Sequence, residues 1–179
     1  MNAPFFEETQ RLRDNPWVLV LIFAVALGPM IPLLYGLYWQ IGHGVPWGNE
    51  PMEDAELIML TVFILLTTCT VGFVMASLRL ETRIDEAGIH YRMFPVKSKW
   101  RVVNPDELEE YSFATRYKPF ESGGIGHHRN VLKNMRSFRI SGGKHIILKY
   151  KNGHRLLLGT QDPGGMEWAI RRLMNKTRV

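Results

Sequence analysis

The sequence predicts an α+β fold, in which an N-terminal two-helix transmembrane hairpin precedes a seven-stranded β-barrel or sandwich capped by a C-terminal α-helix. Hydrophobic residues make up 46% of the chain, yet the mean hydropathy is only -0.10, so these residues are concentrated in a few runs. From Arg79 onward apolar and polar residues alternate instead, which is typical of half-buried strands. We therefore divide the chain into an N-terminal segment (1–16), the hairpin (17–78) and a β domain (79–179).

Two apolar runs, 17–41 and 57–78, are each long enough to cross a bilayer, which takes roughly 20 helical residues. The first run is interrupted by Gly-Pro at 28–29 and by Pro32. Because a spanning segment must still pair its backbone groups internally, we expect a kinked helix there. A cleaved signal peptide is the alternative for this run, but the run is longer than the apolar core of a signal, and no small-residue cleavage site closes it.

The charges beside the two runs predict their orientation. Arg11 and Arg13 precede the first run, and Arg79 and Arg83 follow the second, whereas the loop 42–56 contains acidic residues and no Lys or Arg. Since cytoplasmic flanks carry the excess of basic residues, we expect a multi-pass protein of the cytoplasmic (inner) membrane with both termini in the cytoplasm. The segment 1–16 is then cytosolic, and the loop 42–56 lies outside.

Small residues predict how the two spans pack. Ala24 and Gly28 on the first span, and Gly72 and Ala76 on the second, have the four-residue spacing that lets helix backbones approach closely. With antiparallel spans these pairs lie at a similar depth, so we expect a close contact in the cytosolic half. Neither span contains an ionisable residue, which argues against an ion or proton transporter built from this chain alone.

The β domain is predicted from period-two alternation and from turn residues between the alternating runs. The Asn152-Gly153 pair is the strongest hairpin signal, and residues 104–108 are typical of a single helical turn. The expected strands are 79–85, 89–94, 99–103, 111–117, 138–141, 145–150 and 155–160.

A C-terminal helix follows the last strand. Asp162 is a suitable N-cap and Pro163 a suitable first residue, since proline lacks the N–H that a first turn leaves unpaired. Apolar residues then recur at helical spacing, which predicts one buried face. The expected inner stripe consists of Met166, Ala169, Ile170 and Leu173.

Seven strands followed by one amphipathic helix is the element order of a pleckstrin-homology-like barrel. On the segments Ile84–Arg92, Gly123–Gly126 and Leu157–Pro163, the chain resembles bacterial two-span membrane proteins that carry such a domain, a group of largely unassigned function. The resemblance implies a barrel plugged at one end by the helix, and it implies no reaction. Pleckstrin-homology domains that bind phosphoinositides use a basic first hairpin, whereas the hairpin here, 85–88, is acidic at its tip.

The segment 118–136 is the longest without an expected element, and loops of this length in a compact domain are usually functional or mobile. A phosphate cradle needs its glycines before a helix, with Lys-Ser/Thr in the nucleotide-binding form, and that dipeptide is missing here. The two histidines lack a further ligand at metal-site spacing, so we expect neither a metal nor a cofactor. The candidate residues of this loop are Gly123, Gly124, Gly126, His127 and His128.

Basic residues favour anion recognition by the β domain, which has 20 Lys and Arg against 10 Asp and Glu. Near an anionic leaflet each such residue contributes about 1 kcal/mol of attraction. A solvated basic surface that only follows the charge bias of cytosolic segments is the alternative. The anion- or lipid-facing candidates are Lys97, Lys99, Arg101, Arg129, Lys133 and Arg136.

These patterns favour a membrane-anchored, non-enzymatic binding or scaffolding module at the cytosolic membrane face. Its expected partners are the lipid bilayer, anionic lipid headgroups, another membrane protein or a second copy of the chain. One alternative is a small membrane enzyme using His127, His128 and Glu121, although no Ser or Cys nucleophile motif accompanies them. A subunit of a larger membrane complex is another alternative, and nucleic-acid binding, which would be steeply salt-dependent, is disfavoured by attachment to a bilayer.

Overall fold

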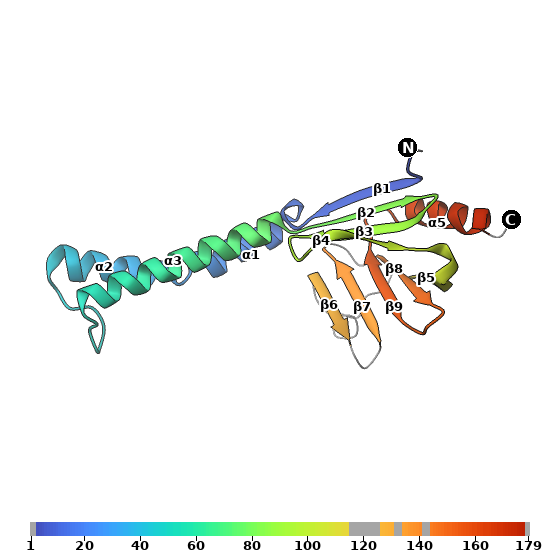
Figure 1. Cartoon of the computed structure of the whole chain (residues 1–179). Helices are drawn as coiled ribbons and strands as arrows, with labels where there is room; N and C mark the ends of the chain where they lie inside the picture. The colour runs from blue at the N-terminus through green and yellow to red at the C-terminus, as the bar shows by residue number, and fades with distance from the viewer. Residues whose placement is uncertain (1–2, 115–125, 131–133, 141–143, 178–179) are drawn as a thin grey trace. The chain divides into compact units, whose positions relative to one another are not determined.

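The computed structural model describes residues 3–114, 126–130, 134–140 and 144–177. They belong to two compact units, which are described separately here (Figure 1). The helical unit comprises Asn15–Ala76, and the β unit combines Met1–Asp14 with Ser77–Val179. Two apolar helical segments, two β-sheets and a C-terminal helix confirm the predicted α+β class.

The helical unit contains α1 (Pro16–Leu27), α2 (Met30–His43) and α3 (Asp54–Ser77). The first apolar segment, Pro16–His43, is interrupted at Gly28-Pro29, where we expect a kink, because Pro29 has no N–H to continue the helical hydrogen bonds. Both Pro16–His43 and Asp54–Ser77 are long and apolar enough to cross a membrane, and only 11% of each apolar window is buried within the structure. Apolar side chains thus point outward on all sides of these helices.

The close contact predicted at Ala24, Gly28, Gly72 and Ala76 is wrong for this structure. Ala24, Gly28 and Ala76 are exposed, and no described atom lies within 4 Å of the position that a Cβ at Gly72 would take. Small residues permit close approach but add little attraction of their own, so the spacing alone does not bring the helices together. An open groove of about 360 Å³ is lined by Leu21, Ile22, Val25, Ala26, Thr67, Thr68, Val71, Gly72 and Met75.

The α2–α3 connection is held by Gln40, which the sequence patterns did not single out. Its buried side chain donates from Nε2 to the Met52 carbonyl at 2.7 Å and to Asp54 Oδ1 at 2.8 Å, and its Oε1 accepts from the Trp47 backbone N–H at 3.3 Å. The Trp47 ring lies flat against α2, since a Cβ at Gly36 would stand 2.6 Å from its Cε3. Gly36 therefore makes room for this ring.

The first sheet of the β unit is antiparallel, with strand order β1-β2-β3-β4 (Figure 1). Its first strand comes from the N-terminal segment, so the predicted boundary that placed 1–16 outside the domain is wrong. In the chain, the helical unit is inserted between β1 and β2, which pair with each other. Just beyond this pairing, the Leu12 N–H donates a hydrogen bond to the Leu78 carbonyl at 3.0 Å. The strands are β1 (Phe6–Arg11), β2 (Arg79–Asp85), β3 (Gly88–Phe94) and β4 (Lys97–Val103).

Side chains of β1 attach it to the far end of the chain. The Glu8 carboxylate accepts hydrogen bonds from Thr160 Oγ1 and from the Gln161 backbone N–H, both at 2.7 Å. The buried Gln10 donates from Nε2 to the Gly159 carbonyl at 2.8 Å and to Glu8 Oε1 at 3.0 Å. The N-terminal strand is therefore bonded both to β2 and to the segment that leads into the last helix.

The second sheet has the order β5-β8-β9-β7-β6, in which β7 and β9 are parallel and the other neighbours antiparallel. The described residues thus form nine strands rather than the predicted seven, because β1 and β6 come from segments expected to be a tail and a loop. A short 3-10 helix, η1 (Leu12–Asp14), follows β1, and η2 (Pro105–Glu107) occupies the expected helical turn. The strands are β5 (Leu108–Ala114), β6 (Gly126–Asn130), β7 (Met135–Arg139), β8 (His145–Tyr150) and β9 (Arg155–Gly159).

The closing helix, α5 (Pro163–Thr177), confirms its prediction in detail. Asp162 Oδ1 accepts a hydrogen bond from the Gly165 N–H at 2.9 Å, as an N-cap does. The predicted inner stripe is fully buried, and it covers a core to which both sheets contribute. The largest fully buried side chains of this core include Leu80, Ile84, Ile89, Met93, Phe138, Ile146, Leu148, Leu156 and Leu158.

Candidate functional site

The β3–β4 hairpin places an arginine over a buried tyrosine. Tyr91 and Arg101 are cross-strand partners, and the Arg101 charge lies close enough to the phenol to lower its pKa, although burial has the larger, opposite effect. Only 5% of Tyr91 is exposed, and its ring centroid lies 5.0 Å from that of Phe138 on β7. Tyr91 therefore connects the first sheet to the second, and Arg101 lies next to it on β4.

The β6–β7 hairpin brings further basic side chains to this junction. His127 is paired with Phe138, and their ring centroids are 4.6 Å apart. Two pairs further along the hairpin, Arg129 stands directly opposite Arg136. Like charges at such a position repel one another, so this pair lowers the stability of the hairpin unless an anion offsets the repulsion.

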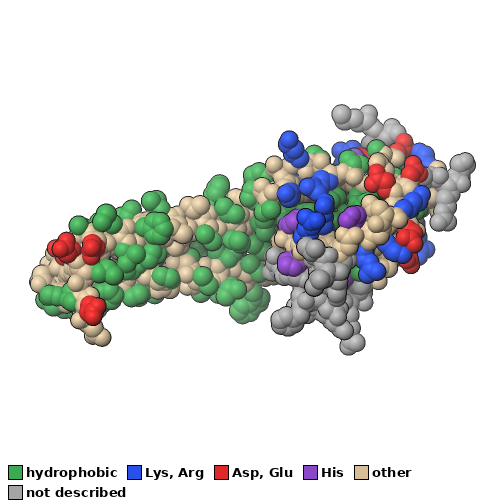
Figure 2. Space-filling model, turned by 60° about the horizontal axis from the view of Figure 1, so that its bottom comes forward, with side chains coloured by type: hydrophobic (Ala, Val, Ile, Leu, Met, Phe, Trp, Pro, Cys, Tyr) green, Lys and Arg blue, Asp and Glu red, His purple; other side chains and the backbone are tan. Residues whose placement is uncertain are grey.

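The electrostatics of His127 tie the two hairpins together. Burial lowers the pKa of His127, and the nearby charges of Lys97, Arg101 and Arg136 lower it further. The ring is therefore neutral at pH 7, and it lies within reach of cations from β4 as well as β7. We call Lys97, Arg101, His127, Arg129 and Arg136 the cationic cluster. Figure 2 shows Lys, Arg and His side chains gathered next to one another on the visible face of the β unit.

A cavity of about 200 Å³ adjoins the cationic cluster and shares Arg136 with it, and Tyr91, the cross-strand partner of Arg101, also lines it. Much of its wall comes from the β8–β9 hairpin, whose turn is closed by hydrogen bonds from the Tyr150 N–H to the His154 carbonyl and from the Gly153 N–H to the Tyr150 carbonyl, both 2.9 Å. The described lining residues are Tyr91, Glu107, Arg136, Tyr150, Asn152, His154, Arg155 and Leu156.

Both phenols in this cavity keep their protons at neutral pH. Burial raises the pKa of Tyr91, and this effect outweighs the hydrogen bond and charge of Arg101 and the charge of Arg136, which lower it. Burial also raises the pKa of Tyr150, with smaller contributions in the same direction from Tyr91 and Glu107. The two hydroxyl groups are therefore available as hydrogen-bond donors.

The predicted site residues separate into three groups. Lys97, Arg101, Arg129, Arg136 and His127 come together, although they were predicted from two distant stretches of the chain. Lys99 is exposed on β4, and no described contact joins it to the cluster. Gly123, Gly124 and Lys133 lie outside the described residues.

The two adjacent histidines do not form a joint site. Successive strand residues point to opposite faces, so the exposed His128, paired with Ser137, faces away from His127. Gly126 leads into strand β6 with φ 106°, and not into a helix as a phosphate cradle requires. Across the described part of the chain, no group of three or more His, Cys, Asp or Glu side chains is arranged to hold a metal ion.

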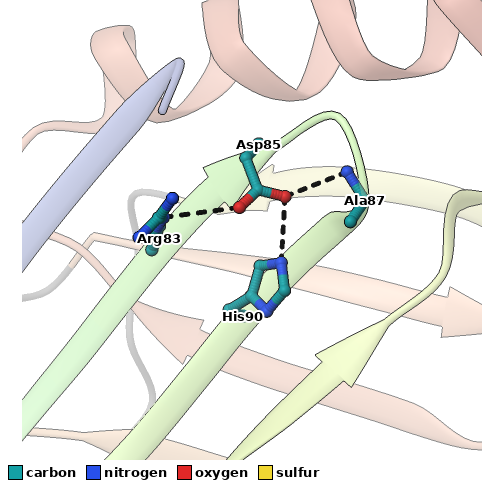
Figure 3. A network of polar contacts seen from close by, with 4 residues as sticks. All are labelled: Arg83, Asp85, Ala87 and His90. Atoms are coloured by element: carbon teal, nitrogen blue, oxygen red, sulfur yellow. Dashed lines mark hydrogen bonds and ion pairs between the residues drawn. The ribbon is translucent and has the colours of Figure 1, made fainter. Parts of the chain in front are cut away.

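The β2–β3 turn is occupied by its own contacts (Figure 3). Asp85 Oδ1 accepts from the Ala87 backbone N–H and from His90 Nε2, both at 2.9 Å, and Oδ2 lies 3.3 Å from Arg83 Nε. Burial raises the pKa of Asp85, but the hydrogen bonds from His90 and Ala87 and the charges of His90 and Arg83 outweigh it, so the pKa is lowered. This hairpin therefore offers no free basic groups comparable to those of a phosphoinositide-binding hairpin.

Sequence reasoning did not single out most of the residues that line the cavity. Tyr91 and Tyr150 are strand tyrosines, and the sequence marked them only by their places in the alternating pattern of apolar and polar residues, which does not indicate a cavity. Comparison of the chain with protein-family models, with curated proteins and with solved structures finds no match.

Proposed function

We propose that this protein is a membrane-anchored, non-enzymatic module that binds an anionic partner at the cytosolic membrane face. One observation carries the proposal: basic side chains from two distant stretches of the chain gather in the cationic cluster. There Arg129 stands opposite Arg136 without a described carboxylate between them. Such an arrangement costs stability in the free protein and favours binding of a negatively charged group.

The anchoring is supported by the helical unit and by its place in the chain. Two helical segments that are apolar on all sides suit a lipid environment. The chain leaves the β unit after Asp14 and returns at Ser77, and a backbone hydrogen bond joins the nearby Leu12 and Leu78, which favours two crossings and both termini on one side. The basic flanks Arg11, Arg13 and Arg79 favour the cytosolic side.

Membership of the pleckstrin-homology-like group remains part of this proposal. Two sheets with a closing helix support it, while the parallel pairing of β7 with β9 and the additional strands depart from the pattern that suggested it. A non-enzymatic role is supported by the separation of His127 from His128, which removes the paired histidines that the alternative enzyme hypothesis needs.

Photo-crosslinking in native membranes tests the proposal. A crosslinking residue replaces the exposed Ser98 beside the cluster in the full-length chain, and the same residue replaces the exposed Arg171 of α5 as the control position. We expect adducts with anionic lipid or with an acidic protein from position 98, and loss of those adducts when Lys97→Gln and Arg129→Gln are combined. Adducts that are the same from both positions, or that persist in the double variant, would refute anion recognition by the cluster.

A further inference from the structure

The cavity beside the cationic cluster collects hydrogen-bond donors from four strands and one turn. Arg136 comes from β7, Arg155 from β9, and Tyr91 and Tyr150 come from β3 and β8. The turn between β8 and β9 adds the Asn152 amide and the His154 imidazole. Among the described lining residues, Glu107 carries the one carboxylate, and it is exposed and already accepts a hydrogen bond from Asn104 Nδ2 at 2.8 Å.

We infer that this cavity binds a phosphate monoester group, with Arg136 and Arg155 as its charged partners and Tyr91 and Tyr150 as neutral donors. The inference rests on the proposed function, because Arg136 belongs to both the cluster and the cavity, and it adds the chemistry of the ligand. Guanidinium groups match the oxygen spacing of phosphate and bind it in a bidentate manner.

The number of donor-bearing side chains, and the separate strands that carry them, favour phosphate over a carboxylate. A carboxylate presents two oxygens in one plane, whereas a phosphate monoester presents three around a tetrahedral centre and carries up to two negative charges. Donor-bearing side chains from β3, β7, β8 and β9 line this cavity, so different side chains are available for separate oxygens of such a group. Both tyrosines are protonated at neutral pH, so they donate to the anion rather than repel it.

The volume of the cavity limits what can be attached to the phosphate. About 200 Å³ corresponds to roughly seven water molecules, since each occupies about 30 Å³ of liquid. A phosphate with a few further heavy atoms fits this space, while drug-sized ligands occupy pockets of about 300 Å³ or more. Two sources meet these limits: a small soluble phosphate compound, and the headgroup of phosphatidic acid.

Inorganic phosphate is the probe, titrated calorimetrically into the full-length chain in nanodiscs of zwitterionic lipid. We expect saturable binding that Arg136→Gln and Tyr150→Phe each weaken roughly tenfold or more, as expected for lost hydrogen bonds to a charged group. Glu107→Gln should strengthen binding severalfold by removing a negative charge, a gain that a misfolded variant would not show. Arg171→Gln, on the exposed side of α5, is the matched control and should bind as the wild type does.

A second arm distinguishes the two sources. Nanodiscs with phosphatidic acid, a monoester, are compared with nanodiscs with phosphatidylglycerol, a diester. Loss of phosphate binding in phosphatidic acid alone assigns the site to the headgroup, and unchanged binding in both assigns it to a soluble compound. Absence of saturable phosphate binding, or binding that Tyr150→Phe and Arg136→Gln leave unchanged, overturns the inference. Crosslinking from Ser98 would still report on the proposed function in that case.

Discussion

Removal of the Glu8 carboxylate should loosen the N-terminal strand from the rest of the β unit. In the structure this carboxylate accepts hydrogen bonds from Thr160 Oγ1 and the Gln161 N–H, which lie between β9 and α5, and one from Gln10 within its own strand. Because β1 is an edge strand with one sheet neighbour, β2, these contacts supply much of its remaining attachment. Glu8→Ala leaves the Thr160 hydroxyl and the Gln161 N–H without this acceptor.

The expected destabilisation of β1 follows from the two hydrogen bonds that Glu8 accepts from outside its own strand. Hydrogen bonds to a charged group contribute about 1.5 to 3 kcal/mol each, and Glu8 is half-exposed, so the lower part of that range applies to its two bonds. Allowing for water that replaces part of the lost contacts, we expect local opening of β1 to become easier by about 2 kcal/mol. This corresponds to amide hydrogen exchange that is roughly 30-fold faster, since every 1.4 kcal/mol is tenfold.

Hydrogen exchange of the Phe6–Arg11 amides in the full-length chain measures this opening. Glu7→Ala is the matched control, because Glu7 is exposed on the opposite face of the same strand. Thr160→Val completes a double-mutant cycle, and its effect should be smaller when Glu8 is already replaced. If Glu8→Ala exchanges no faster than Glu7→Ala, or if the two effects simply add, Glu8 does not hold the strand.

Three further expectations concern other parts of the chain. Gly165→Ala should lower the thermal midpoint, because the new Cβ collides with the N-cap carboxylate of α5, whereas Gly164→Ala has its nearest atom at 3.7 Å and should be tolerated. Arg136→Gln should raise the pKa of His127 toward its usual value, measured by NMR. Because this pKa is lower in the folded chain, the wild type should lose stability as the pH falls through about 6.5. Gln40→Leu should expose the α2–α3 connection to proteolysis in detergent, and wild-type resistance would contradict its assigned role.

Much of the β unit could be predicted because local sequence periods follow local structure. The buried faces of β2 and α5, the Asp162 cap and the hairpin at 152–153 were all visible as alternation, helical spacing or turn residues. Two strands were missed for different reasons. The β1 sequence is short and polar, and β6 contains His-His-Arg, so neither shows the apolar alternation on which the prediction depended.

The packing of the two apolar helices, by contrast, could not be predicted from local sequence patterns. Small residues at Ala24, Gly28, Gly72 and Ala76 indicated where helix backbones could approach, but this spacing does not determine which helix faces pack together. In the structure Gly36 makes room for Trp47 instead, a contact between positions that no periodic pattern relates.

The sequence by itself determined the apolar helices, most strands, the closing helix and the list of basic residues from which the cationic cluster is drawn. The tertiary structure decided that β1 pairs with β2 across the inserted helical unit, and that residues of β4 and β7 meet around Tyr91. The physical reason is the range of the interactions. Periodicity and turn chemistry act between near neighbours in the chain, whereas strand order and register come from pairings between distant segments that exist only once both have folded.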